Sequence, residues 1–220
     1  MESFLELRNS SGKDWATLLF VFAFALIAIT KTLFESRFYD FIKLTVSDKY
    51  IKIYKDGGHI NSWFNISLFV VQMISFTFLI QLTLSHWGWV SKTDGIKFIQ
   101  IITLLAVFVL SKYLVEKIVA TAFEIEEFTE QFNLQKVSYR TLIGVLLLPV
   151  NVFLFYNTIY SKYFLFILIF TILVINLITY FKSLKMYQSL LISKIFYFIL
   201  YLCALEIAPY YFMYYWFTRS

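Results

Sequence analysis

Long apolar runs, separated by shorter polar connections, dominate the chain. β-Strands would show alternation of apolar and polar residues, and helices on a soluble protein would show a narrow apolar stripe. Since about 20 residues of helix cross the hydrocarbon core of a bilayer, the pattern predicts an all-α, polytopic membrane protein. Residues 1–220 are expected to form one integral membrane domain. The predicted six-helix bundle has transmembrane helices at about 15–34, 63–85, 96–116, 142–160, 163–181 and 195–217.

The first of these runs is short, because its uninterrupted apolar part ends at Ile29. Leu33 and Phe34 extend it beyond Lys31, whose amine can reach the membrane interface along its apolar stem. A secretory signal peptide is the alternative. Because the preceding tail carries three acids against two bases, and no small-residue cleavage site follows, we expect a retained helix.

The composition supports a membrane protein. Hydrophobic residues make up 60% of the chain, charged residues only 15%, and the mean hydropathy is +0.73. These values differ strongly from those of an ordinary soluble domain. The single cysteine, Cys203, excludes an internal disulfide and the usual cysteine-based zinc spacings.

Lysine and arginine are distributed unequally among the connections. Those after the first, third and fifth predicted helices carry thirteen of the nineteen basic residues, and the other side carries six. Because basic residues are retained on the cytoplasmic side, both termini are expected outside the cytoplasm, in the periplasm of a bacterial inner membrane. The same bias accounts for most of the net charge of +5, so no nucleic-acid partner is expected.

The three cytoplasmic connections are expected to be amphipathic, since each extends an apolar stripe beyond the membrane. The first comprises Phe34, Phe38, Phe41 and Ile42, with Arg37 beside it; the second, Leu114, Ile118, Ile125, Phe128 and Phe132; the third, Leu184, Tyr187 and Leu191.

These stripes have two interpretations. They lie on the lipid headgroups or pack on one another, or they form a docking surface for a partner protein. Four acids follow the third predicted helix, and an anionic leaflet repels carboxylates. These acids are therefore expected to face water, a basic partner, or the basic loop around Lys49, Lys52 and Lys55. The candidate docking residues are Glu124, Glu126, Glu127 and Glu130.

Glu206 is expected near the centre of the last predicted helix. A carboxyl group is costly there, and an intramembrane acid marks a candidate functional site. Cys203 and Pro209 share its face, and Pro209 leaves the carbonyl of Leu205 without its helical donor. Three roles remain open: a neutral acid hydrogen-bonded within the bundle, a group that binds a proton or cation during transport, or a contact with a partner's helix.

Other polar residues in the predicted spans are candidate partners for Glu206. They are Asn151, Asn176, Gln72 and Gln100. Gly144, Pro149 and Asn151 also make the fourth helix polar and able to kink, and two broken helices frame the binding site in many transporters. Six glycines and two prolines are nevertheless few for a transporter that unwinds its helices.

Catalytic and metal-binding motifs are not found in the sequence. His59 and His86 lie at opposite ends of the second predicted helix, about 40 Å apart on a continuous helix, so they cannot share a metal ion. Cys203 has no histidine near it in sequence. We therefore expect no enzymatic activity, no metal and no cofactor.

Three stretches, DWATLLF, TLFESRFYDFIKL and above all FYFILYLCALEIAPYY, resemble the integral membrane proteins of Bacteroidota grouped as domain of unknown function 4271. The resemblance spans nearly the whole chain. It implies an inner-membrane protein and directs attention to Leu205, Glu206, Ile207 and Pro209. It does not supply an activity.

The expected function is that of a small accessory or structural subunit of a bacterial envelope machine, surrounded by membrane lipid and bound to a protein partner. Protein export, surface assembly and gliding motility are the contexts associated with that lineage. The alternative is a stand-alone proton-coupled transporter centred on Glu206, with a small molecule or ion as substrate. Glu206→Gln is expected to inactivate such a transporter and to have little effect on a structural acid.

Overall fold

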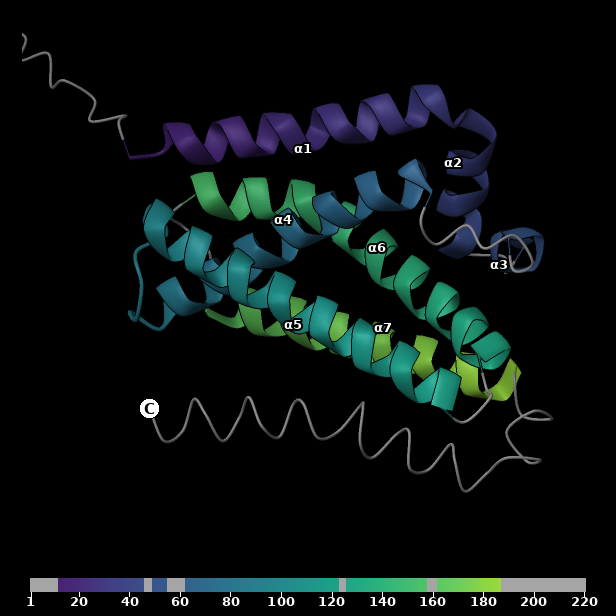
Figure 1. The fold of residues 1–220 in the computed structure, drawn as a ribbon. Helices are drawn as coiled ribbons and strands as arrows, with labels where there is room; N and C mark the ends of the chain where they lie inside the picture. The colour runs from purple at the N-terminus through teal and green to yellow at the C-terminus, as the bar shows by residue number, and fades with distance from the viewer. Residues whose placement is uncertain (1–11, 46–48, 55–61, 123–125, 158–161, 187–220) are drawn as a thin grey trace, which may run out of the picture.

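The computed structural model of the chain describes residues 12–45, 49–54, 62–122, 126–157 and 162–186, and every regular element in these ranges is a helix (Figure 1). The elements are α1 (Asp14–Leu33), α2 (Glu35–Ile42), η1 (Lys43–Thr45), α3 (Lys49–Tyr54), α4 (Trp63–His86), α5 (Gly95–Ala122), α6 (Glu126–Tyr156) and α7 (Lys162–Met186).

Four of the described helices are long and apolar enough to cross a membrane. They are α1, α4, α5 and the part of α6 from Phe132 to Tyr156. The apolar stretch of α7, Tyr163–Thr179, is shorter. The all-helical fold class is confirmed over the described residues, whereas the count of six spans stays a prediction, because 195–217 lies outside them.

The apolar runs predict the bounds of α1 and α4 closely, but not the start of α6. The predicted fourth span begins at 142, whereas α6 begins at Glu126. The residues between these positions include good helix formers and neither glycine nor proline, so the amphipathic segment and the apolar span form one helix. This helix also continues through Pro149. Similarly, α5 extends beyond the predicted end at 116 to Ala122.

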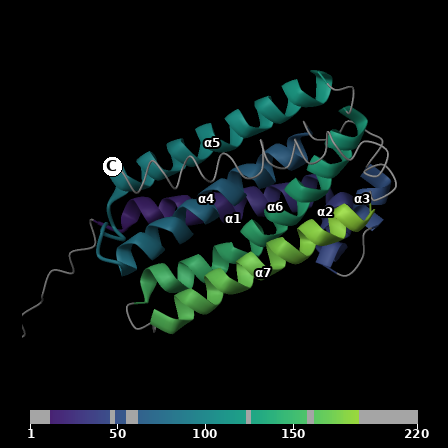
Figure 2. The ribbon, with the colours of Figure 1, turned by 90° about the horizontal axis from the view of Figure 1, so that it is seen from below.

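α4 is the central helix of the bundle. It contacts α1, α5 and α6, while α7 packs mainly against α6. In the most apolar part of α4, 61% of the residues are buried, compared with 11% in α5. Figure 2 shows α5 and α7 on opposite sides of the bundle, with α4, α1 and α6 between them. α5 and α7 therefore form two outer sides of the described bundle.

An aromatic cluster joins four helices at the end of the bundle where α1 begins. Phe20 of α1 stacks on Phe78 of α4 with ring centroids 4.1 Å apart, and Phe98 of α5 lies 4.6 Å from Phe78. Phe155 of α6 meets Phe78 edge to face, at 5.8 Å. Large aromatic side chains bury much apolar surface in such contacts, so this cluster fixes how the four helices meet.

A second apolar cluster lies at the other end, where α2 and α3 pack against α4 and α6. Phe38 and Phe41, from the first predicted stripe, are buried there, but Ile42 is exposed and Arg37 is buried. In the second predicted stripe, Phe132 is buried whereas Leu114 and Ile118 are exposed. The described members of the second stripe have no common face because they belong to two different helices, α5 and α6. Ile125 lies outside the described residues.

Candidate functional site

The residues predicted to form an intramembrane polar site are only partly described. Glu206, Cys203 and Pro209 lie outside the described residues. Asn151 is buried between α6 and α4, whereas Asn176 is half-buried on α7, where its Nδ2 donates to the carbonyl of Ile172 at 2.8 Å. Asn151 and Asn176 therefore have different surroundings.

Asn151 belongs to a group of buried polar residues between α4 and α6, here called the polar seam: Gln72, Ser75, Thr141 and Asn151. Asn151 Nδ2 donates to the carbonyl and hydroxyl oxygens of Ser75, at 2.7 and 3.1 Å. Thr141 Oγ1 donates to Gln72 Oε1 at 2.7 Å. These bonds pair groups that are costly to bury alone. The Oδ1 of Asn151 has no partner within the described residues.

Gly144 allows α4 and α6 to approach closely at the polar seam. A Cβ atom at this position would lie 2.9 Å from Gln72 Cα, a backbone atom that cannot turn away. Small residues permit such close packing between membrane helices. Gly144 therefore acts here as a contact point between two helices.

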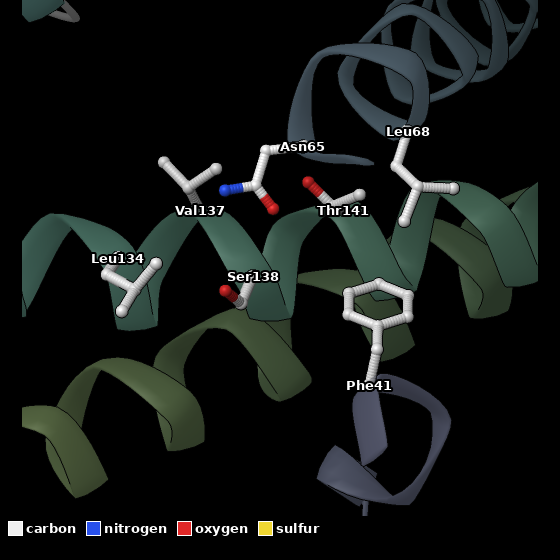
Figure 3. Close-up of a pocket in the computed structure, with 7 residues that line it drawn as sticks. All are labelled: Phe41, Asn65, Leu68, Leu134, Val137, Ser138 and Thr141. Atoms are coloured by element: carbon white, nitrogen blue, oxygen red, sulfur yellow. The ribbon is translucent and has the colours of Figure 1, made fainter. Parts of the chain in front are cut away.

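A small crevice adjoins the seam, between α6, α2 and the start of α4. Figure 3 shows the amide of Asn65 directed toward α6, between Val137 and Thr141. The volume of the crevice is about 10 Å³, which is close to the minimum for one water molecule. It cannot hold an organic substrate.

Arg37 lies at the centre of an aromatic cage at the same end of the bundle. Its guanidinium carbon lies 4.7 Å from the ring centroids of both Tyr54 and Phe64, and its Nη1 donates to Ser62 Oγ at 2.9 Å. Cation–π contacts and this hydrogen bond stabilise the charge, which connects α2 with α3 and α4. Sequence reasoning placed Arg37 beside an apolar face and missed the cage. The tyrosines and phenylalanines nearby in the sequence were the available signal.

Tyr50 lies against this cage and is fully buried. Burial raises the pKa of the Tyr50 phenol above its ordinary value of 10.0, and the charge of Arg37 partly offsets the rise. The phenol is therefore neutral at physiological pH.

A cavity of about 550 Å³ lies between α4, α5, α6 and α7. We call it the basic cavity, because its charged lining residues, Lys136 and Arg140, are both basic. The other polar lining residues are Gln72, Asn176 and Thr179; the remainder are Met73, Phe76, Leu105, Phe108, Val109, Phe132, Tyr139, Leu173 and Leu177. Sequence reasoning did not find this cavity.

The two basic residues of the cavity differ in their surroundings. Lys136 Nζ lies 3.3 Å from Oε1 of the buried Glu116 on α5, and Lys112 Nζ lies 3.9 Å from the same oxygen. Arg140, by contrast, forms no hydrogen bond, ion pair or ring contact with any described residue. One charge in the cavity is therefore paired, and the other is not paired within the part of the chain that is described.

A second cavity, of about 330 Å³, lies between the C-terminal part of α5 and the N-terminal part of α6. We call its lining the α5–α6 surface: Tyr113, Lys117, Ala120, Glu126, Thr129, Glu130 and Asn133. Two predicted docking acids, Glu126 and Glu130, belong to it. Glu127 is part of α6, and Glu124 lies outside the described residues.

The α5–α6 surface contains buried polar atoms without a hydrogen-bond partner. Thr129 is 3% exposed and Asn133 6%, yet the Thr129 hydroxyl and the Asn133 Oδ1 pair with nothing among the described residues. Glu126, on the same surface, accepts a hydrogen bond from Thr121 Oγ1 at 2.6 Å. This surface therefore has unused hydrogen-bonding capacity beside two carboxylates.

The opposite end of the bundle is closed by the connection between α4 and α5. Lys92 Nζ donates to the carbonyl of Phe155 at 3.1 Å, and Gln81 Nε2 donates to that of Asp94 at 2.9 Å. Partial burial lowers the pKa of Lys92, and the charge of Lys13 lowers it further. Within the described ranges, no group of three or more His, Cys, Asp or Glu residues could hold a metal ion.

These features define the class of protein. It is all-helical over the described residues, four of its helices are long and apolar enough to span a membrane, and cavities with polar lining residues lie between helices. The chain belongs to the family described as Domain of unknown function (DUF4271), whose model matches residues 16–217. The resemblance to domain of unknown function 4271 is thereby confirmed, whereas the Bacteroidota source and the inner-membrane location stay predictions. No curated protein and no solved structure matches the chain.

Proposed function

We propose that the chain is a small accessory or structural subunit of a bacterial envelope assembly, with no catalysis of its own. In this proposal it spans the inner membrane six times, with both termini in the periplasm, and it binds a protein partner in the cytoplasm. The observation that carries the proposal is the α5–α6 surface, where buried polar atoms and carboxylates surround an unfilled cavity.

The unpaired atoms favour an interaction surface. A buried polar group without a partner costs about 1–3 kcal/mol. A segment of a partner protein that donates hydrogen bonds to Asn133 Oδ1 and Thr129 Oγ1 would remove that cost. Glu126 and Glu130 beside these atoms favour a basic segment, because arginine presents several donors to carboxylates.

The lengths of α5 and α6 support a position outside the hydrocarbon. With 28 and 31 residues, these helices are about 42 and 47 Å long, compared with about 30 Å for the hydrocarbon core. Lys112, Lys117 and Lys136 lie in the half of each helix nearer the end where α5 finishes and α6 begins. The bias of basic residues toward the cytoplasm therefore favours a cytoplasmic α5–α6 surface.

The test is affinity purification in mild detergent at native expression level, with co-purifying proteins quantified by mass spectrometry. The wild-type chain is compared with a Glu126→Lys/Glu130→Lys double variant. The matched control is Glu35→Lys, which reverses an exposed acid at the start of α2. We expect a stoichiometric partner with the wild type and the control, and its loss with the double variant at unchanged abundance. A wild-type protein that purifies without a partner would contradict the proposal.

The basic cavity favours a second candidate function, a proton-coupled carrier. Its volume of about 550 Å³ and its mixture of polar and apolar lining suit a small ligand. A carrier predicts that Glu206→Gln leaves the protein abundant but abolishes its activity. Unchanged activity in that variant would count against this candidate.

A further inference from the structure

We propose that the basic cavity binds an anionic phospholipid, with the phosphate at Arg140 and an acyl chain along the apolar wall. This proposal uses no residue of the α5–α6 surface and does not rest on the proposed function.

The lining of the cavity combines polar and apolar groups, as a phospholipid does. On α7, Leu173 lies six residues before Thr179, which is about 9 Å along the helix axis. On α4, Gln72 lies one turn before Phe76, whereas on α6 the apolar Phe132 lies one turn before Lys136. Polar and apolar groups therefore both line the cavity, and on α4 and α7 they lie at different heights.

Arg140 supplies the attraction for an anionic group. It lines the cavity, is only half-exposed and pairs with no described residue. Among the described residues that line the cavity none is acidic, and the nearby Glu116 is already bound by Lys136. A guanidinium group binds phosphate through two parallel hydrogen bonds. Basic pockets between membrane helices bind anionic headgroups in the same manner.

Gln72 provides a second polar group without a complete set of partners. It is 3% exposed and lines the cavity, and its Oε1 accepts the hydrogen bond from Thr141. Its Nε2 donates to no described residue. This amide can therefore donate to a phosphate or ester oxygen of a bound lipid.

The wall formed by α7 favours a lipid over a soluble anion. Leu173 and Leu177 line the cavity, yet they are 62% and 58% exposed. The cavity is therefore open on the side that faces hydrocarbon, and a lipid can enter it laterally from the bilayer. A free phosphate would contact the polar groups and leave the apolar walls unfilled.

The proposal is tested on the full, delipidated chain by native mass spectrometry with phosphatidylglycerol, and with phosphatidylcholine as the zwitterionic comparison. Arg140→Gln is expected to weaken phosphatidylglycerol binding about tenfold or more, since it removes a charge-assisted contact. The control, Lys31→Gln, removes an exposed lysine at the end of α1 and should change nothing. Equal binding of the two lipids, or equal binding by wild type and Arg140→Gln, would overturn the proposal.

Leu177→Trp provides an independent variant that leaves Arg140 in place. The larger ring should fill apolar space in the cavity and lower the affinity for phosphatidylglycerol. Competition by inorganic phosphate alone would show that the site binds the anion, not the lipid, and would contradict the proposal. Absence of lipid binding in the wild type would overturn it too.

Discussion

The polar seam and the α5–α6 surface have similar residues but different hydrogen bonding. In the seam, Asn151 and Thr141 donate to Ser75 and Gln72 across a close helix contact, and the Oδ1 of Asn151 lacks a partner within the described residues. In the α5–α6 surface, the hydroxyl of Thr129 and the Oδ1 of Asn133 are equally buried but unpaired within the described residues. The difference separates a polar contact that completes the fold from one that leaves capacity for another molecule.

The largest expected effect is on the close helix contact. Gly144→Val should lower the free energy of unfolding by about 3 kcal/mol, because the new side chain meets the backbone of Gln72. Thermal unfolding in detergent measures the change. Gly95→Ala is the matched control, since a Cβ there would lie 3.5 Å from the Trp15 ring, an ordinary van der Waals contact. Equal destabilisation by both substitutions would show that Gly144 has no special role in the contact.

A smaller effect on stability is expected from two Thr→Val substitutions, each of which removes one threonine hydroxyl group. Thr141→Val should cost about 1 kcal/mol, because it breaks the bond to Gln72. Thr129→Val should leave stability unchanged or slightly higher, because its hydroxyl has no partner among the described residues. It should nevertheless weaken partner binding. If Thr129→Val were as destabilising as Thr141→Val, the comparison between the two regions would fail.

The smallest effect concerns pH near the aromatic cage around Arg37. The raised pKa of Tyr50 means that above pH 10.0 the unfolded chain releases a phenolic proton that the folded chain retains. The contribution of Tyr50 to stability is therefore complete below pH 10.0 and is lost as the pH rises above it. Unfolding measured between about pH 9 and 11 should show a shallower decline in Tyr50→Phe than in the wild type. Tyr39→Phe, at an exposed position, should match the wild type.

Sequence patterns predict those features that depend on a single helix. The apolar runs place α1 and α4 closely, and Asn151 is conspicuous as an amide in an apolar segment. The start of α6 is missed because no glycine or proline separates the amphipathic segment from the apolar span. From the sequence, Gly144 is predicted to let the fourth helix kink. Its observed role, a close contact between α4 and α6, depends on Gln72, which lies 72 residues earlier in the sequence.

Contacts between distant segments could not be predicted in the same way. Ser75 as the partner of Asn151 and the cage around Arg37 depend on which helices pack together. The basic cavity depends on the distances between four helices, and the spacing of apolar residues along the sequence does not predict these distances. Most of the candidate site was therefore beyond sequence reasoning, although Glu126, Glu130 and Asn176 were identified as polar positions to follow.

The polar seam also constrains the order of events on the ribosome. Ser75 and Asn151 are 76 residues apart, and at about 5–20 residues per second the second follows the first after about 4–15 s. During that interval α4 has been synthesised but its partner helix has not. The hydroxyl of Ser75 and the amide of Gln72 must then rely on the insertion machinery or on water for hydrogen bonds. α4, the most buried of the four described candidate spans, is thus the one most dependent on protection while the chain is made.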